Sequence, residues 1–404
     1  MKAICTGLIA GTVCYMFILQ LQAVSANPSS ERVLYSFCPK GGFHCSDGAS
    51  PESSLINVNG TLYGTTYGGG NSESGVIFAL RAGTDREDVL HSFGDGNDGL
   101  NPMGGVIYVK GSLYGTAYSG GGHGAGALFA LDLTTDAEAT EYGFCGEEFC
   151  LDGEGPEGGL IKTKGTLYGM TSAGGAVGNG TIFSYDMKTG TETVILSFVG
   201  RNGSDPQAGL LDIDGRLYGT TSGGGTHGCG TVFSFDPDAG ETVLHSFGCG
   251  TDGAFPKSGL IEVNGTLYGT AWSGGVRGCA SGTGCGTVFS VNASTGAEAV
   301  LHAFDNTDGQ WPTAGLIDVK GVLYGTTSFG GAYTSCGDGA GCGTVFAIDP
   351  HTGQETVVYS FGGTDGATPV GGLINVNGLL YGTTSAGGAY GYGTVFMLIP
   401  VAPA

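Results

Sequence analysis

A block of about fifty residues recurs along this chain, and it constrains the fold more than any other feature of the sequence. Each copy contains Leu-Tyr-Gly-Thr-Thr or a near copy of it. A Gly-Gly pair, Gly-Thr-Val-Phe, a stretch such as Glu-Thr-Val-Leu-His-Ser-Phe and Asp-Gly-X-X-Pro follow in order. The seven tyrosines are Tyr63, Tyr114, Tyr168, Tyr218, Tyr268, Tyr324 and Tyr381. A period near fifty with strand-like runs and glycine pairs is typical of a β-propeller with one four-stranded blade per repeat.

The two ends of the repeat array are incomplete in complementary ways. Residues 31–37 match the last strand of a repeat, with no repeat before them, whereas the seventh repeat stops at residues 393–400 without its last strand. We therefore predict an all-β fold, a seven-bladed β-propeller of four-stranded antiparallel blades, closed by the N-terminal strand, which completes the last blade. Such closure removes exposed sheet edges.

Turn chemistry recurs at two places in each repeat. The first two strands are expected to join through two-residue turns in which glycine supplies the positive φ of a primed turn: Asn59-Gly60, Lys110-Gly111, Lys164-Gly165, Asp214-Gly215, Asn264-Gly265, Lys320-Gly321 and Asn377-Gly378. The aspartate of Asp-Gly-X-X-Pro, replaced by Asn202 in the fourth repeat, is expected to accept hydrogen bonds from the backbone two residues further on. A ring of calcium ligands is the alternative role for these aspartates, which are Asp47, Asp98, Asp152, Asp252, Asp308 and Asp365.

The repeated motif carries a resemblance to a known family. Leu-Tyr-Gly-Thr-Thr, a Gly-Gly pair and Gly-Thr-Val-Phe together resemble the GloVer-type tandem repeat of secreted or surface-anchored proteins, over residues 31–398. The resemblance implies export and a propeller-like fold, and it brings no established activity and no catalytic residues. The glycine pairs and the period are also similar, more loosely, to those of kelch propellers.

The N-terminus is interpreted as a secretory signal. Lys2 is followed by an apolar stretch from about residue 8 to residue 24, and Val24-Ser25-Ala26 is a small-residue cleavage site. We therefore divide the chain into a signal peptide, residues 1–26, and a single propeller domain, residues 27–404, with no membrane span in the mature chain. If the host is a eukaryote, the sequons at Asn59, Asn179, Asn202, Asn264 and Asn292 predict a glycoprotein.

Ten cysteines remain after the signal, and they fall into neighbouring pairs. In an exported chain these predict five disulfides: Cys38 with Cys45, Cys145 with Cys150, Cys229 with Cys249, Cys279 with Cys285, and Cys336 with Cys342. For the third pair we expect a hairpin about Ala239 in which residues whose numbers add to about 478 face each other. The alternative is two free buried thiols.

The charge composition of the chain argues against two classes of binding partner. Only 12% of the residues are charged, and scarce lysine and arginine give a net charge of −22. This balance argues against a nucleic-acid or anionic-membrane partner, because both need a basic stripe. The sequence shows no nucleophile elbow, zinc-protease motif, phosphate loop or nucleotide fingerprint, so we predict no cofactor and no metal site.

The links between blades and the Gly-rich loops between second and third strands should share one face of the disc. All variation in loop length falls in these segments, and binding residues concentrate on loops held by a rigid scaffold. Candidate ligand-binding residues are aromatic departures from the repeat, which could stack on sugar rings or pack between blades: Tyr67, Tyr118, Trp272 and Trp311.

Candidate catalytic residues lie in the same variable loops. His44, His123 and His227 could act as general acid or base or as metal ligands, and Arg277 could pair with a ligand carboxylate. Solvated loop side chains are the alternative for all four. His91, His245 and His302 recur at one strand position and are interpreted as structural.

Two classes of function are compatible with this pattern. The first is a secreted, extracellular, monomeric propeller that binds a glycan, a cell-wall polymer or a protein through its loop face. The second is an extracellular enzyme, a polysaccharide lyase or a small-metabolite-converting enzyme, with a His, Tyr and Arg site at the central funnel. Convergence of the candidate side chains around the centre would favour the enzyme, and dispersal around the rim would favour binding.

Overall fold

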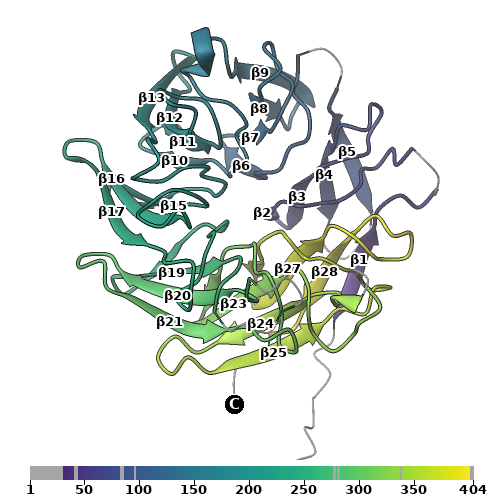
Figure 1. The fold of residues 1–404 in the computed structure, drawn as a ribbon. Coiled ribbons are helices and arrows are strands. Elements are labelled where there is room, and N and C mark those ends of the chain that lie inside the picture. The colour runs from purple at the N-terminus through teal and green to yellow at the C-terminus, as the bar shows by residue number, and fades with distance from the viewer. Residues whose placement is uncertain are drawn as a thin grey trace, which may run out of the picture.

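The computed structural model describes residues 31–40, 44–81, 86–94, 97–275, 279, 283–336 and 339–400. Its strands form seven four-stranded antiparallel sheets, which are arranged as blades around a central axis (Figure 1). The predicted all-β seven-bladed propeller is therefore confirmed. The predicted signal peptide lies outside the described residues.

Each blade runs from an inner first strand to an outer fourth strand. Blade 1 contains β2 (Ile56–Val58), β3 (Thr61–Thr66), β4 (Val76–Arg81) and β5 (Glu87–Ser92), and blade 2 contains β6 (Val106–Val109), β7 (Ser112–Ala117), β8 (Ala127–Asp132) and β9 (Ala137–Gly143). Blade 3 contains β10 (Ile161–Thr163), β11 (Thr166–Thr171), β12 (Thr181–Asp186) and β13 (Thr191–Ser197), and blade 4 contains β14 (Leu211–Ile213), β15 (Arg216–Thr221), β16 (Thr231–Asp236) and β17 (Gly240–Ser246). Blade 5 contains β18 (Ile261–Val263), β19 (Thr266–Ala271), β20 (Thr287–Asn292) and β21 (Glu298–Ala303), and blade 6 contains β22 (Ile317–Val319), β23 (Val322–Thr327), β24 (Thr344–Ile348) and β25 (Glu355–Ser360). Blade 7 contains β26 (Ile374–Val376), β27 (Leu379–Thr384), β28 (Thr394–Leu398) and β1 (Arg32–Ser36).

Ring closure takes place in blade 7. β1 pairs antiparallel with β28, from Arg32 opposite Met397 to Ser36 opposite Thr394. In Figure 1 the purple β1 lies beside the yellow β28, so the two ends of the array share one sheet. The N-terminal strand therefore supplies the outer strand that the seventh repeat lacks, as predicted.

The first two strands of each blade are joined by the predicted tight turns. In blade 1, Val58 pairs with Thr61, and the two residues between them, Asn59 and Gly60, have φ values of 53° and 87°. Positive φ at both central positions is the geometry of a primed turn, which matches the twist of the flanking strands. The equivalent residues of the other six blades also have positive φ.

The glycine of Leu-Tyr-Gly-Thr-Thr and the phenylalanine of Gly-Thr-Val-Phe are neighbours on adjacent strands. In blade 4, Gly219 pairs with Phe233, and a Cβ on Gly219 would lie 2.7 Å from Phe233 Cζ. The other six blades give 2.5–2.7 Å for the same pair of positions. The motif therefore couples a residue without a side chain to a ring that occupies the vacated space.

Neighbouring blades pack through a second set of phenylalanines. Phe37, which follows β1, meets Phe78 of blade 1 edge to face with ring centroids 5.2 Å apart, and both side chains are completely buried. The same contact recurs at the other six junctions, with centroids 5.0–5.3 Å apart. The hydrophobic core thus lies between blades, and each repeat buries its apolar face only against its neighbours.

The five predicted disulfides are all present: Cys38–Cys45, Cys145–Cys150, Cys229–Cys249, Cys279–Cys285 and Cys336–Cys342. The strand register expected for the third of them, with paired numbers adding to about 478, is shifted by one to two residues. Val232 pairs with His245, which adds to 477, and a β-bulge between Val232 and Phe233 lowers the sum to 476, since Phe233 pairs with Val243. The same bulge occurs in all seven blades.

The three-residue 3₁₀ turn η1 (Glu148–Cys150) lies in the link between blades 2 and 3. No helix among the described residues has the length and apolar character needed to cross a bilayer.

Candidate binding site at the loop face

Two kinds of loop meet on one side of the disc, as predicted, and we call this side the loop face. Each interblade link pairs with the Gly-rich loop of the blade that it enters, as Ala49 does with Gly68 and Ser204 with Gly223. The contact is close, because a Cβ on Gly224 would lie 2.3 Å from the Gly200 carbonyl oxygen. The links and loops therefore form one rigid layer on the strands.

The residue before each link proline is clamped by its backbone. Trp311 N–H donates to the Cys285 carbonyl of blade 5, and the Trp311 carbonyl accepts from Ser328 N–H of blade 6, at 2.8 and 3.2 Å. All seven residues at this position have positive φ, and only one of them is glycine. Their side chains can differ because the backbone alone holds the position: Ser50, Asn101, Gly155, Asp205, Phe255, Trp311 and Thr368.

A pocket of about 360 Å³ opens at the centre of the loop face, and we call it the mouth. It is lined by the start of every blade, because the chain passes from the link proline straight into the inner strand. One half-buried side chain per blade comes from the residue that follows this proline: Glu52, Met103, Glu157, Gln207, Lys257, Thr313 and Val370. Small residues follow in turn and bring the seven backbones close together.

A chain of aromatic rings from blades 5 and 6 lies beside the mouth, next to Lys257, although none of these rings lines the pocket itself. Trp272 lies 6.4 Å from Phe255 and 5.0 Å from Trp311, and Trp311 lies 5.4 Å from Phe329, measured between ring centroids. All four side chains are half-buried. Lys257 Nζ, from the mouth itself, lies 5.2 Å from the centroid of the Trp272 ring, within the range of a cation–π contact.

Blades 1 and 2 place two further aromatic side chains near the mouth. Tyr67 and Tyr118 are 37% and 38% exposed, so both rings are accessible on the loop face. A Cβ on Gly155 would lie 3.0 Å from Tyr118 Cε2, which places this ring over the link that leads to Glu157. Burial and the charge of Glu157 raise the pKa of Tyr118, so its hydroxyl keeps its proton at neutral pH.

Two carboxyl groups of the mouth have altered acidity. Burial, followed by the charge of Asp205, raises the pKa of Glu157 to about 7, although Ser172 and Lys257 act in the opposite direction. Burial also raises the pKa of Glu52. Asp205 itself accepts hydrogen bonds from Ser222 and Gln207. At neutral pH the mouth therefore presents both donors and acceptors beside aromatic surface.

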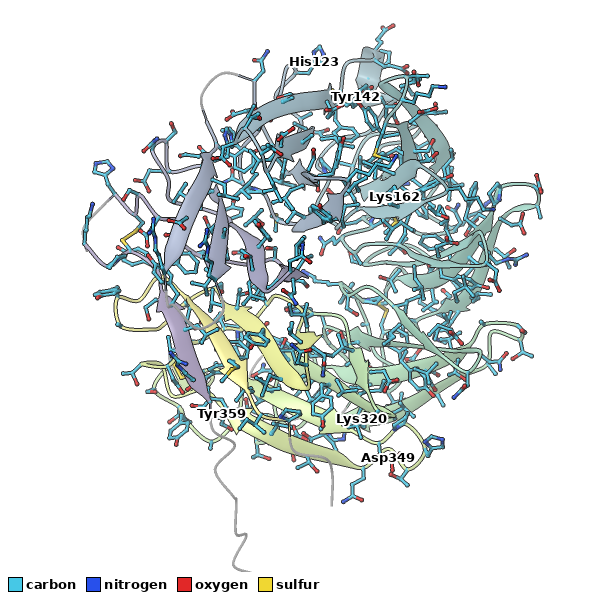
Figure 2. The ribbon with its side chains drawn as sticks, turned by 180° about the vertical axis from the view of Figure 1, so that it is seen from behind. His123, Tyr142, Lys162, Lys320, Asp349 and Tyr359 are labelled. Atoms are coloured by element: carbon cyan, nitrogen blue, oxygen red, sulfur yellow. A yellow bond between two sulfur atoms is a disulfide. The ribbon has the colours of Figure 1, made fainter. Side chains whose placement is uncertain are left out.

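The candidate catalytic histidines do not gather at the mouth. His44 Nδ1 lies 3.0 Å from Glu73 Oε1 on the exposed surface of blade 1. His123 lies in the β7–β8 loop at the outer rim of blade 2, near Tyr142 (Figure 2), and His227 is exposed in the β15–β16 loop of blade 4. None of the three lines the central pocket. Arg277 lies outside the described residues.

The strand histidines have structural partners. His91 and His302 Nε2 lie 3.0 and 2.8 Å from carboxylate oxygens of Asp98 and Asp308, the Asp-Gly-X-X-Pro aspartates of the adjoining links. In other blades a tyrosine hydroxyl takes this role, as Tyr142 does toward Asp152 at 2.7 Å.

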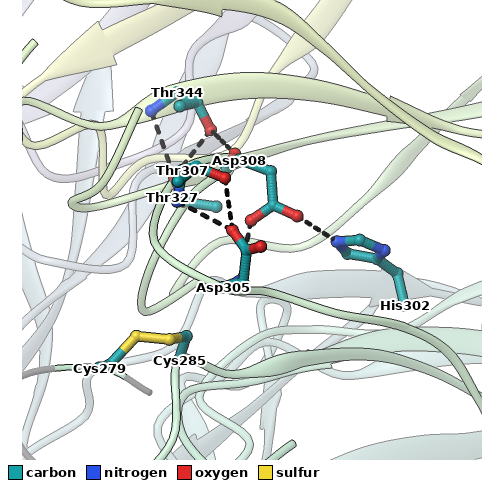
Figure 3. A network of polar contacts seen from close by, with 8 residues as sticks. All are labelled: Cys279, Cys285, His302, Asp305, Thr307, Asp308, Thr327 and Thr344. Atoms are coloured by element: carbon teal, nitrogen blue, oxygen red, sulfur yellow. Dashed lines mark hydrogen bonds and ion pairs between the residues drawn. A yellow bond between two sulfur atoms is a disulfide. The ribbon is translucent and has the colours of Figure 1, made fainter. Parts of the chain in front are cut away.

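The backbone donors to these aspartates precede them, contrary to our expectation of donors two residues further on. Asp305 N–H donates to Asp308 at 3.0 Å (Figure 3), and in blade 1 Gly94 N–H donates to Asp98 at 3.1 Å. His302, Asp308 and Glu355 form one group whose potential ligand atoms lie within 4.8 Å of one another. Because the Asp305 N–H and the His302 imidazole already donate to the Asp308 carboxylate, the geometry is that of a link turn.

The aromatic positions stand out in the sequence, whereas the ring of residues that lines the mouth was not predicted from it. The available signal was the residue after each link proline, which differs in every repeat except the two with glutamate, while the proline itself is constant. Variation at one position of a constant repeat marks a surface that the fold does not constrain.

Comparisons with known proteins agree with this architecture. The profile of the Gloeobacter/Verrucomicrobia repeat family matches residues 24–216 and 175–396. No curated protein was found to match the chain.

Solved structures show the same fold at low sequence identity. An oligogalacturonate lyase in complex with manganese aligns with a TM-score of 0.52 and 12% identity, over 92% of this chain and 98% of the lyase. The extracellular domain of a one-component system from B. thetaiotaomicron aligns with a TM-score of 0.54 and 12% identity, over 91% of this chain and 40% of that longer chain. At such identity the likeness concerns the fold alone.

Proposed function

We propose a binding function from the premise that this chain belongs to the Gloeobacter/Verrucomicrobia repeat family: it is an exported propeller whose mouth holds a saccharide. The observation that carries the proposal is the aromatic chain Phe255, Trp272, Trp311 and Phe329 beside the central pocket. Half-buried aromatic rings offer flat apolar surface to the C–H faces of sugar rings.

The remaining groups of the mouth suit a hydroxyl-rich ligand. Glu52, Gln207 and Thr313 supply acceptors and donors, and Lys257 supplies a cation. A pocket of about 360 Å³ is at the lower end of the range typical for small-ligand sites, so it would take one or two sugar rings. Most sites of this kind combine apolar walls with a few polar groups that fix orientation.

The aromatic residues also suggest the length of the ligand. Tyr67 and Tyr118 come from blades 1 and 2, whereas Trp272 and Trp311 come from blade 5 and the link to blade 6, so the two groups flank different sides of the mouth. A chain of several sugars could cross the mouth and contact both groups. We therefore propose an internal segment of a glycan or cell-wall polymer as the ligand.

The repeats themselves provide substitutions for the test. Four blades have serine at the position of Trp272, and blade 7 has threonine at the position of Trp311. Trp272→Ser with Trp311→Thr should therefore fold normally and lower the affinity for polysaccharides. Retention by immobilised plant and microbial polysaccharides measures this, with Tyr390→Ala, an exposed aromatic of the β27–β28 loop, as the control. Equal retention of the double variant and the wild type would refute a saccharide site at the mouth.

An enzymatic function is the second candidate, and one observation favours it. Glu157, with its pKa raised to about 7, lies within electrostatic reach of Asp205 and Lys257 at the edge of the mouth. A carboxyl group poised near neutral pH can act as a general acid. Dispersal of His44, His123 and His227 over blades 1, 2 and 4 weighs against the histidine-based site considered from the sequence.

Incubation with the retained polysaccharide distinguishes binding from catalysis. New reducing ends or the absorbance of unsaturated products would indicate an enzyme, and Glu157→Gln should then abolish turnover while it leaves retention unchanged. Constant reducing ends and absorbance with the wild type would leave binding as the function.

We also propose that the protein is exported from the cell. Five disulfides agree with an oxidising compartment. In a eukaryotic host, the exposed sequons Asn59, Asn264 and Asn292 would be available for glycosylation. Asn202 would not, because its side chain accepts from Val199 N–H and donates to Glu241.

A further inference from the structure

A glutamate recurs at every junction between blades, far from the mouth. It lies at or next to the start of the outer strand and faces the Asp-Gly-X-X-Pro residue of the link from the preceding blade. In each of the seven glutamates the Oε1 atom is buried and has no hydrogen-bond partner: Glu31, Glu87, Glu138, Glu192, Glu241, Glu298 and Glu355. Six of these seven glutamates face an aspartate, and their unpartnered buried oxygens call for a common explanation.

At three junctions a tyrosine lies between the two carboxyl groups. Tyr35 donates its hydroxyl proton to Asp47 at 2.8 Å and Tyr142 donates to Asp152 at 2.7 Å; Tyr359 donates to Asp365 in the same way. The same hydroxyl oxygens also contact the facing glutamates, and Tyr359 Oη lies 3.5 Å from Glu31 Oε2. A hydroxyl group has one proton, so a hydroxyl that donates to aspartate can only accept from glutamate. A glutamate can therefore form a hydrogen bond with this hydroxyl only as the donor, in its protonated form.

The groups that act on these carboxyls are acids, tyrosines and one histidine. At the junctions with a tyrosine, Glu31 faces Asp365 and Tyr359, Glu87 faces Asp47, Asp88 and Tyr35, and Glu192 faces Asp152, Glu147 and Tyr142. At the other three junctions, Glu138 faces Asp98 and Glu141, Glu298 faces Asp252, and Glu355 faces His302, Asp308 and Asp305. His91 and His245 lie beside Asp98 and Asp252 at two of these junctions, and Arg86 pairs with Asp88. Burial is the largest influence throughout, and it raises the pKa of Glu87 to about 8 and that of Glu31 and Glu192 to about 7.

We infer that six of the seven blade junctions are stabilised by a proton held between the glutamic acid of one blade and the aspartate of the preceding link. The contacts between blades are therefore most stable at acidic pH. Loss of that proton leaves two neighbouring carboxylates with one hydroxyl or imidazole donor between them, and their repulsion weakens the contact between blades. Blade 4 is the natural exception, because Asn202 replaces the aspartate and its amide donates to Glu241 Oε2 at 3.1 Å.

The sign of the pH dependence follows from the direction of these shifts. A carboxyl whose folded pKa is raised above its unfolded value holds its proton longer in the folded state. Its contribution to stability is fully present below the unfolded value of about 4.5 and is lost as the pH rises through about 7 to 8. The melting temperature of the full chain should therefore fall between pH 5 and pH 8.5.

Substitution by glutamine tests the inference, because glutamine resembles the protonated acid and cannot ionise. Glu87→Gln with Glu192→Gln should leave the melting temperature unchanged at pH 5 and raise it above that of the wild type at pH 8.5. Glu241→Gln is the matched control, since its glutamate faces an amide, and its effect at pH 8.5 should be smaller.

Three outcomes would overturn the inference. The first is an equal fall in melting temperature with pH for the wild type and the double variant. The second is a double variant less stable than the wild type at every pH, which would mean that the glutamates act as ionised acceptors. The third is a rise in the wild-type melting temperature at pH 8.5 on addition of calcium chloride that the double variant lacks, which would assign neutralisation to a cation and not to a proton.

Discussion

At the scale of single residues, the glycine of each Leu-Tyr-Gly-Thr-Thr block is the position with least room. A Cβ on Gly219 would lie 2.7 Å from Phe233 Cζ and 3.1 Å from Leu210 Cδ2, and none of these groups has space to retreat in a buried sheet. The block is therefore constant because the strand-to-strand packing needs it. The side chains that vary, at the mouth and beside it, are those whose backbone is held by hydrogen bonds alone.

Gly219→Ala should destabilise the fold. Forced contact with Phe233 is an overpacking substitution, for which we expect a loss of about 1–3 kcal/mol in the free energy of unfolding. Urea denaturation measures the loss. Adding Phe233→Leu, which shortens the opposing side chain, should make the two effects less than additive. An unchanged urea midpoint for the single variant would contradict the packing account of the motif.

Residue-level prediction from sequence depended on the comparison of one repeat with another. Tyr67, Tyr118 and Trp272 stood out at a position that is serine in the other repeats, and Trp311 stood out in an Asp-Gly-X-X-Pro link. All four belong to the loops and links of one face. For Asp98 we predicted hydrogen bonds from the backbone, but from donors two residues further on. The donor is Gly94 N–H instead, because the backbone at the end of the preceding strand folds back onto the aspartate. Partners across a blade junction, such as Glu87 with Asp47, could not be read from sequence.

At the scale of elements, the outer hairpin of each blade carries a bulge. In blade 4 the bulge leaves Leu244 unpaired between Val243 and His245, so the paired numbers add to 477 on one side of the bulge and to 476 on the other, against the expected sum of about 478. Hydrophobic alternation fixes which face a strand buries, but it does not show where an extra residue is inserted. The disulfide between Cys229 and Cys249 forms nonetheless, with the two Cα atoms 5.4 Å apart.

Removal of that disulfide should weaken blade 4. The bond closes a loop with a sequence separation of 20 residues, and Cys229→Ser with Cys249→Ser should lower the free energy of unfolding by about 3 kcal/mol. Peptide mapping without reduction provides the control, because it should recover the two cysteines in one linked fragment. Alkylation of either cysteine in the native wild-type protein would contradict the pairing.

At the scale of the whole molecule, the ring depends on β1. The strand pairs with β28, and the residue after it, Phe37, packs on Phe78 of blade 1. One short segment therefore completes the sheet of blade 7 and packs this blade against blade 1. This closure was predictable from the sequence, because the two incomplete ends of the repeat array complement each other. The resemblance to kelch propellers stays a prediction.

A chain that begins at Cys38 should lose this closure. Compared with a chain that begins at Glu31, it leaves the edge of β28 unpaired, and we expect a lower melting temperature and a tendency to aggregate. Differential scanning calorimetry and light scattering of the two chains measure both effects. Identical unfolding curves would mean that the ring does not depend on β1.

The central claim is that the mouth binds a saccharide, and the tryptophans of the chain allow a direct measurement. The sequence contains 2 tryptophans, Trp272 and Trp311, and both lie beside the mouth. Intrinsic tryptophan fluorescence therefore reports on this site alone. Titration with hexasaccharides of glucose, xylose and mannose should give a saturable change in emission with at least one of them. Trp272→Ser, which retains Trp311 as the reporter, should then weaken binding about tenfold. Tyr390→Ala should bind as the wild type does. Unchanged emission with all three sugars, or equal affinity of Trp272→Ser and the wild type, would contradict the account.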